Sequence, residues 1–197
     1  VNKLTQNKNL KGLSVIDGDI LNLNLENLNL KCPIKIIGNI PYNITSSIIF
    51  WLIEQLDFWQ EAYVMMQKEV AERLVADVGT KAYGRITVVT SAYLKKEICF
   101  NIPPEVFFPK PKVQSSLVQF IPYETVKHNF DFEKMEELTR FVFAKKRKML
   151  RTIFKKEGGS SFLNSINIEA FRQIDHELNI FFYFFCHTKK MRTYPLN

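Results

Sequence analysis

Residues 38–42, Gly-Asn-Ile-Pro-Tyr, combine side chains suited to holding a flat, polar ligand. Asn39 offers a side-chain amide, and the ring of Tyr42 offers a face on which a nucleobase can stack. Pro41 has no backbone N–H and stiffens the loop, which leaves carbonyl groups free to accept hydrogen bonds. The residues alone are compatible with a base-binding loop and also with a plain turn that ends a strand.

A second polar segment, Asp17-Gly18-Asp19, follows a short apolar run at residues 13–16. Asp-Gly is common in turns, so a simple turn is the alternative to a ligand site. Both segments follow expected strands, and ligands of open α/β sheets lie beyond the carboxyl ends of the strands. We therefore expect the two segments at the same edge of a sheet.

The excess positive charge is concentrated late in the chain. Residues 1–124 carry 13 basic and 12 acidic side chains, whereas residues 125–197 carry 14 basic and 8 acidic ones. Seven of these bases lie between residues 145 and 156. A block of one sign indicates a polyanionic, phosphate-rich partner, with a solvated basic tail as the alternative.

Several protein classes are not indicated. The three cysteines are scattered and form no CxxC pair, which argues against a disulfide framework or zinc ribbon and fits a reducing cytosol. The histidines have no partners at metal-ligand spacing, so no metal is expected. The apolar run at 180–186 is far shorter than the about 20 residues that span a bilayer. The opening residues do not resemble a secretory leader.

Apolar spacing predicts an α/β body followed by a helical lobe. Strands are expected at residues 13–16, 34–37, 61–66, 95–100 and 114–121, and helices at 45–55 and 68–75, with Thr45 or Ser46 as a cap. Residues 86–94 fit either a helix or a strand. The alternation favours a mostly parallel sheet with antiparallel strands added at its end. Further helices are expected at 132–143, 145–154, 160–163 and 168–185, which divides the chain into domains at 1–124 and 125–197.

Five spaced segments resemble motifs of the KsgA-type ribosomal RNA adenine dimethyltransferases. They are GNIPYNI at 38–44, QKEVAERL at 67–74, KAYGR at 81–85, FFPKPKV at 107–113 and FAKKRKMLR at 143–151. The resemblance extends from the start of the chain to about Phe154, and the ordered set is far more specific than the NIPY loop alone.

The resemblance implies a Rossmann-like, S-adenosylmethionine-dependent methyltransferase fold with a small C-terminal helical domain. The implied activity is transfer of methyl groups to N6 of two adjacent adenines near the 3′ end of 16S, small-subunit rRNA. The implied setting is a cytoplasmic monomer, with neither metal nor membrane, that acts on a 30S assembly intermediate.

Particular residues acquire roles from the resemblance. The Asn39 side chain and a backbone carbonyl of Ile40 or Pro41 would hold the adenine amine, while Tyr42 and Phe107 would enclose the flipped base. From composition alone, ordinary core packing is the more natural role for Phe107.

The cofactor and the RNA are assigned in the same way. Asp19 would accept from the adenine amine of S-adenosylmethionine, with Ile20 beside it and Asn39 near the methionine part; Asp17 is the competing candidate for the first role. The rRNA phosphates would meet a basic set: Lys110, Lys112, Lys145, Lys146, Arg147, Lys148 and Arg151.

The chain departs from the family pattern at two places. It contains no G-x-G, and the first two strands and the glycine-rich cofactor loop of the family have no counterpart. We therefore expect an N-terminally truncated fragment that binds S-adenosylmethionine weakly or not at all. Residues 179–197 also differ from the closing helix of the family.

Two other functions stay open at this point. One is methylation of an adenine in large-subunit rRNA, as in the macrolide-resistance enzymes. The other is a non-catalytic RNA-binding factor, for ribosome assembly or transcription, built on the same fold.

Overall fold

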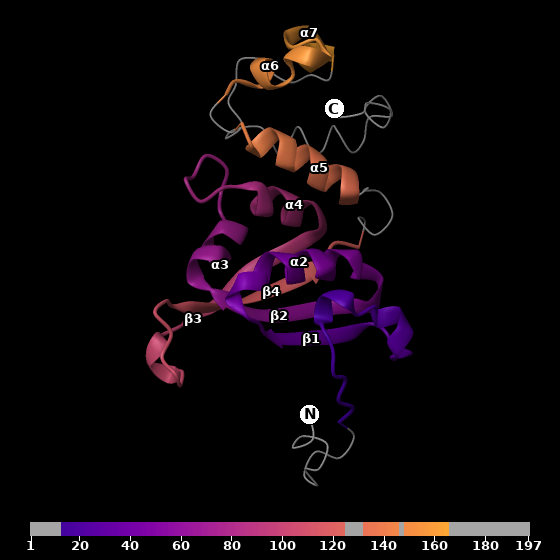
Figure 1. Ribbon diagram of the computed structural model, residues 1–197, viewed down its shortest axis with the longest axis vertical. Coiled ribbons are helices and arrows are strands. Elements are labelled where there is room, and N and C mark those ends of the chain that lie inside the picture. The colour runs from indigo at the N-terminus through magenta and orange to yellow at the C-terminus, as the bar shows by residue number, and fades with distance from the viewer. Residues whose placement is uncertain (1–12, 125–131, 146–147, 166–197) are drawn as a thin grey trace.

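A mixed four-stranded sheet forms the centre of the molecule (Figure 1). The computed structural model describes residues 13–124, 132–145 and 148–165. The strands are β1 (Ile34–Asn39), β2 (Trp59–Gln67), β3 (Leu94–Ile102) and β4 (Ser115–Pro122), in the spatial order β1-β2-β4-β3. β1 and β2 are parallel, and β4 is antiparallel to both β2 and β3. The expectation of a mostly parallel sheet with antiparallel strands added at its end is confirmed only in part: β1–β2 is the one parallel pairing among the described strands, and the antiparallel β4 lies between β2 and β3 rather than at the end.

Three helices cover one face of this sheet: α2 (Thr45–Glu54), α3 (Lys68–Leu74) and α4 (Arg85–Tyr93) (Figure 1). Alternate residues of β2, including Val64 and Met66, are buried beneath them. Trp59 is fully buried, and its indole nitrogen donates to the Leu52 carbonyl of α2 at 2.8 Å. Burial of large side chains of this kind contributes about 1.5–3 kcal/mol each, which fixes the helices on the sheet.

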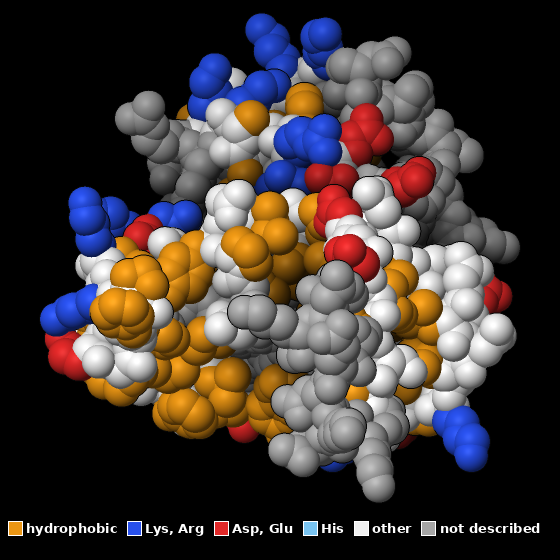
Figure 2. Space-filling model, turned by 60° about the horizontal axis from the view of Figure 1, so that its bottom comes forward, with side chains coloured by type: hydrophobic (Ala, Val, Ile, Leu, Met, Phe, Trp, Pro, Cys, Tyr) orange, Lys and Arg blue, Asp and Glu red, His pale blue; other side chains and the backbone are white. Residues whose placement is uncertain are grey.

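The opposite face of the sheet is more exposed and carries a polar cluster. The Glu61 carboxylate accepts hydrogen bonds from the Tyr63 hydroxyl at 2.6 Å and the Gln119 amide at 2.5 Å, and pairs with Lys35 at 2.9 Å. These bonds, that of Tyr63 foremost, lower the pKa of Glu61 to about 2. Ile37 on the same sheet is 84% exposed, and Figure 2 shows apolar side chains gathered on the side of the molecule below the sheet.

The helices α5 (Phe132–Phe143), α6 (Leu150–Ile153) and α7 (Ser160–Ser165) lie beyond the α2–α4 layer, away from the sheet (Figure 1). Phe132 joins the two parts through edge contacts with Phe50 and Tyr93, at ring-centroid distances of 5.6 and 6.0 Å. Arg85 stacks over Phe50 and pairs with Glu136 of α5. α5 is thus attached to the body by aromatic packing and an ion pair.

Short 3-10 turns link these elements: η1 (Ile20–Asn22), η2 (Leu25–Leu28), η3 (Tyr42–Ile44), η4 (Leu56–Phe58), η5 (Pro104–Val106) and η6 (Lys155–Glu157). No helix within the described ranges is long and apolar enough to cross a bilayer.

The structure corrects three local expectations. The strand expected at 13–16 is wrong, because this run has no hydrogen-bonded neighbour among the described strands. The helix expected at 145–154 begins only at Leu150; Lys145 and Lys148 lie in a turn, in which the Lys148 N–H donates to the Lys145 carbonyl at 2.8 Å. Neither Thr45 nor Ser46 caps α2, because Thr45 is already helical and its hydroxyl bonds back to the Tyr42 carbonyl at 3.1 Å. The helix expected at 168–185 lies outside the described residues.

Tertiary contacts explain why the segment at 86–94, which fits either a helix or a strand, is helical. The Thr87 hydroxyl accepts from the Gly84 N–H at 3.0 Å and donates to the Arg73 carbonyl at 2.6 Å. It thereby fixes the start of α4 against the end of α3. Val88 and Val89 are buried on the helix that follows, despite their preference for strands.

A half-buried lysine lies between β3 and α4. The Lys96 ammonium donates to the Thr87 carbonyl at 2.9 Å and to the hydroxyls of Thr90 and Ser91. None of these groups carries a negative charge, and burial lowers the pKa of Lys96 to about 7. Because the unfolded lysine titrates near 10.5, the folded protein binds fewer protons between these pH values, and stability rises with pH across that window.

We predict that Lys96→Met stabilises the protein by about 1–2 kcal/mol at pH 6, because it removes a charge that is costly to bury. The Thr90 and Ser91 hydroxyls keep their bonds to helix carbonyls in the variant. The gain should shrink as the pH rises toward 10. Urea unfolding at several pH values measures this, with exposed Lys95→Met as the control; equal gains at pH 6 and pH 10 would contradict the assignment.

Candidate functional site

A pocket of about 240 Å³ opens at the sheet edge where β1 ends. Three short stretches of chain line it: Asn39, Ile40, Pro41 and Tyr42 after β1, Met65 on β2, and Phe107, Phe108, Pro109 and Pro111 before β4. The pocket therefore brings together all five residues expected to act on the substrate base.

Strand pairing positions the first wall. Asn39 is the last residue of β1 and pairs with Met65 of the parallel neighbour β2. Gly38, the residue before Asn39, lies close to the loop, because a Cβ atom there would lie 3.3 Å from Cγ2 of Ile40. A larger residue would require the Ile40 side chain to shift by a few tenths of an ångström. Asn39 is exposed, and its amide has no protein partner within the described residues.

The loop after Asn39 leaves one carbonyl available. The Pro41 carbonyl accepts from the Ile44 N–H at 3.3 Å and is thus engaged in the η3 turn. The Ile40 carbonyl has no backbone donor in the described part of the chain. Of the two carbonyls that the sequence suggested, that of Ile40 is the better acceptor for a ligand.

Tyr42 is anchored by its hydroxyl, which lies 2.7 Å from Oγ of Ser115, the first residue of β4. Ser115 is fully buried, so the bond reaches into the core. It fixes the tyrosine ring at the rim of the pocket and ties the β1 loop to a strand two positions away in the sheet.

The opposite wall comes from the connection between β3 and β4. The Phe107 N–H donates to the Pro104 carbonyl at 3.2 Å, which closes the η5 turn and places Phe107, half-buried, beside the pocket. Phe108 is fully exposed at its mouth. Lys110 pairs with Glu105 at 2.6 Å on the same connection, and this bond lowers the pKa of Glu105.

No lining residue of this pocket is charged. Its polar groups are an amide and a carbonyl, which can accept hydrogen bonds from an amine, and its walls are aromatic or apolar. Such a site suits a neutral, flat ring that bears an exocyclic amine. A phosphate or a carboxylate would find no cation among the lining side chains.

Of the three residues expected at the cofactor, Asn39 lines this pocket, whereas Asp19 and Ile20 lie outside it. Asp19 is exposed, and its Oδ1 accepts from the Leu21 N–H at 3.0 Å at the start of η1. Its other carboxylate oxygen has no protein donor in the described part of the structure and can accept from an amine, so its chemistry fits the expected role. Ile20 follows in η1, half-buried against the core.

The basic residues fall into two groups. Lys110 and Lys112 are exposed beside the pocket, on the chain segment that lines it. Lys145, Lys148 and Arg151 lie at α5 and α6, on the far side of the helical layer (Figure 1). Lys145 also stacks on Phe141 at 4.3 Å. Lys146 and Arg147 lie outside the described residues.

Sequence reasoning missed Met65, Phe108, Pro109, Pro111 and Ser115. Met65 and Ser115 are placed by strand pairing, which the local sequence pattern does not reveal. The proline-rich connection was noted only as a motif, and its exposed Phe108 is a signal that becomes visible only in three dimensions.

The model of the ribosomal RNA adenine dimethylase family matches residues 1–180. The chain is 38% identical over 166 residues to ribosomal RNA small subunit methyltransferase A of Rhizobium johnstonii, covering 83% of this chain and 60% of that protein. It is 41% identical over 140 residues to the protein of the same name from Dichelobacter nodosus, covering 71% and 53%. The chain thus spans a little over half the length of these relatives.

Solved structures confirm the Rossmann-like methyltransferase fold. A dimethyladenosine transferase from Plasmodium falciparum superposes with a TM-score of 0.65 at 34% identity, over 79% of this chain and 54% of that one. The 23S rRNA methyltransferase ErmE gives a TM-score of 0.59 at 20% identity, over 86% and 69%, which shows a shared fold. With most of its length matched by the family model, the chain belongs to the ribosomal RNA adenine dimethylase family.

Proposed function

We propose that this protein transfers methyl groups from S-adenosylmethionine to N6 of two adjacent adenines near the 3′ end of small-subunit rRNA. One observation carries the proposal: the Asn39 amide and the Ile40 carbonyl line an uncharged pocket between Tyr42 and Phe107. The names of the relatives from Rhizobium and Dichelobacter support the small subunit as the substrate.

The pocket addresses the weak nucleophilicity of the adenine amine. The lone pair of N6 is delocalised into the ring, so the amine is planar and unreactive. The Asn39 side-chain oxygen and the Ile40 carbonyl accept the two N6 hydrogens and hold the nitrogen pyramidal, which frees its lone pair. No strong base is needed at this stage, because the nitrogen becomes acidic once it is alkylated.

Aromatic walls hold the base once it has left its stack. Tyr42, anchored through Ser115, covers one face, and Phe107 closes the other. Stacking of this kind is worth about 1–3 kcal/mol per base, which offsets the cost of flipping. Fixing the amine in line with the methyl donor can supply on the order of 7–11 kcal/mol of the barrier reduction.

S-adenosylmethionine, when bound, supplies an electrophilic methyl group. The Asp19 carboxylate would accept from the adenine amine of this cofactor, Ile20 would lie beside its ring, and Asn39 would border the methionine part.

The wider setting completes the proposal. Residues 1–124 form the catalytic body and 125–197 a basic helical domain, and the protein acts as a cytoplasmic monomer on a 30S assembly intermediate. Lys110, Lys112, Lys145, Lys148 and Arg151, together with Lys146 and Arg147, meet rRNA phosphates. Such contacts position an RNA without reading its sequence.

The other two functions receive less support. The similarity to ErmE, at 20% identity, extends to the fold alone, so it does not favour large-subunit rRNA. A non-catalytic factor would have no need of unpaired acceptors in the lining of an aromatic pocket.

The proposal predicts where label appears when the protein, as its gene encodes it, is given radiolabelled S-adenosylmethionine. Unmethylated small subunits and large-subunit rRNA are offered separately, and the labelled adenines are mapped. We expect label on adjacent adenines near the small-subunit 3′ end. Label on the large subunit alone, or on neither RNA, would overturn the proposal.

Asn39→Ala should lower the rate of methylation at least about a hundredfold while RNA affinity changes less than about twofold, because the amide acts mainly on the amine in the transition state. Single-turnover methylation and RNA binding measure the two quantities. Asn43→Ala is the matched control, since Asn43 is exposed and lies outside the pocket. Equal losses in the two variants would refute the role of Asn39.

The two basic groups should act independently of RNA sequence. Lys112→Ala and Lys148→Ala should each reduce the slope of log affinity against log salt by about 0.7–0.9, as expected when one phosphate contact is lost. Lys31→Ala, just before β1 and at the opposite end of that strand from Asn39, should leave the slope unchanged. A slope that stays constant in Lys112→Ala and Lys148→Ala would rule out these contacts.

A further inference from the structure

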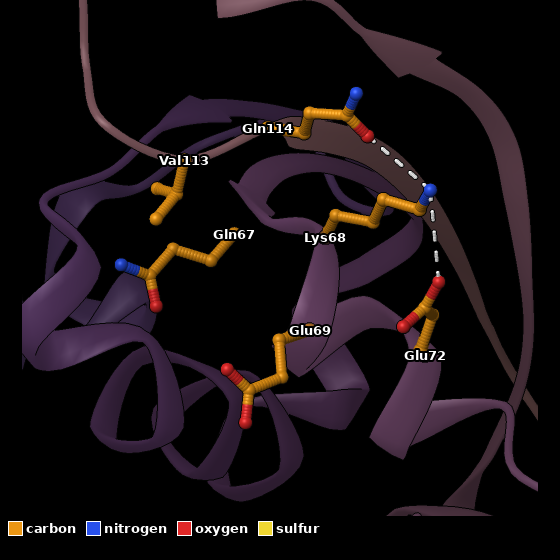
Figure 3. Close-up of a pocket in the computed structure, with 6 residues that line it drawn as sticks. All are labelled: Gln67, Lys68, Glu69, Glu72, Val113 and Gln114. Atoms are coloured by element: carbon orange, nitrogen blue, oxygen red, sulfur yellow. Dashed lines mark hydrogen bonds and ion pairs between the residues drawn. The ribbon is translucent and has the colours of Figure 1, made fainter.

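A second pocket, of about 370 Å³, lies at the same edge of the sheet. Its walls come from the end of β2, the beginning of α3 and the two residues before β4 (Figure 3). The lining residues are Gln67, Lys68, Glu69, Glu72, Val113 and Gln114. The Lys68 N–H donates to the Gln114 carbonyl at 2.9 Å, which holds the two walls together.

The two pockets follow one another along β2, although they have no lining residue in common. Met65 lines the first and Gln67 the second, and both lie on the less buried face of β2, two residues or roughly 6.5 Å apart. Gln67 also pairs across the ladder with Ser115, the residue that anchors the Tyr42 hydroxyl. A base stacked on Tyr42 therefore has the second pocket directly beside it.

Most polar groups of the second pocket are already engaged. The Lys68 ammonium donates to Oε1 of Gln114 at 3.2 Å and lies 3.9 Å from the Glu72 carboxylate. Glu69 pairs with Arg73 at 2.5 Å. The Gln67 amide has no protein partner within the described residues, and Figure 3 shows it reaching into the space below Val113, apart from the Lys68 group.

These groups select the kind of ligand. Two carboxylates against one ammonium disfavour a phosphate. The described residues contain no cluster of three metal-binding side chains, which disfavours a cation. A primary amide presents a donor and an acceptor side by side, the complement of the N6 and N7 edge of adenine. The Val113 side chain adds an apolar surface against which a ring can pack.

We propose that this second pocket holds the nucleobase next to the target adenine and that Gln67 reads the edge of that base. The inference rests on the proposed function, because it takes the first pocket as the site of the flipped adenine. It adds a residue that determines specificity. An enzyme that methylates two adjacent adenines recognises the neighbouring adenine while it methylates the target adenine.

The test uses RNA hairpins whose loop holds one target adenine. The nucleotide on its 5′ side, and separately on its 3′ side, is either adenine or an abasic residue. Affinity is measured by fluorescence anisotropy for the parent protein, Gln67→Ala and Gln67→Glu. Gln60→Ala is the matched control, because Gln60 is exposed at the other end of β2.

One abasic substitution should weaken binding to the parent about tenfold, as loss of one bidentate amide–base contact does. Gln67→Ala should cause a similar loss on the adenine-flanked RNA and no further loss on that abasic RNA, while Gln60→Ala binds as the parent does. Gln67→Glu keeps the size of the side chain and removes its donor, so it should show the same pattern even if Gln67→Ala destabilises the fold.

The inference would be overturned if the Gln67 variants lost affinity equally for every RNA, or lost affinity for none. Methylation of the target adenine by the parent protein is followed in parallel. If the adenine is labelled and the Gln67 pattern is missing, this inference alone is wrong. If no adenine is labelled, the proposed function has failed and the inference fails with it.

Discussion

The register of β1, β2 and β4 is the constraint on which the site depends. β1 and β2 run parallel, so both end at one edge; β4 runs against them and begins there. β3, antiparallel to β4, ends at this edge as well. Segments that are far apart in the sequence therefore meet within hydrogen-bond distance, as Tyr42 and Ser115 do across a separation of 73 residues. A shift of one residue in β2 would turn Met65 and Gln67 toward the helices and remove the floor of both pockets.

At the same edge of the sheet, the first pocket is uncharged and charged side chains lie around it. The first pocket contains no charged side chain, so no ionic group of its lining competes for the Asn39 and Ile40 oxygens. Two of the lysines nearby are paired, Lys110 with Glu105 and Lys68 with Glu72, whereas Lys112 is exposed. The neutrality of the site is thus a property of its lining.

Local sequence pattern was sufficient for the elements that are long and apolar. The expected strands at 34–37 and 61–66 and the expected helices at 45–55 and 68–75 correspond closely to β1, β2, α2 and α3. It failed where partners decide the outcome: the run at 13–16 has apolar residues and no neighbouring strand, and 86–94 is rich in β-branched residues yet is held helical through Thr87. Motif resemblance, rather than periodicity, located Phe107, because the nearby Phe100 and Phe108 made a core role plausible. Ser115 could not be found from either source. Gln67 belongs to a motif that the resemblance quoted, but only the strand register shows that it adjoins the Tyr42 loop.

The position of the basic residues bears on how affinity and selectivity are divided. Lys145, Lys148 and Arg151 lie on the lobe beyond the helices, whereas the pockets lie at the sheet edge. Ionic contacts act through charge and tolerate any sequence, while base-edge contacts require one arrangement of donors and acceptors. In the proposed function, the lobe and the pockets therefore have separate roles: the lobe binds the phosphate backbone, and the pockets select the base that is methylated.

The Arg85–Glu136 pair and the Phe132 contacts join α5 to the α2–α4 layer, so these contacts set the distance between the basic residues of the lobe and the pockets. An RNA that satisfies both must present its unpaired adenines at a fixed offset from its backbone, and that geometric requirement adds selectivity that neither surface has alone.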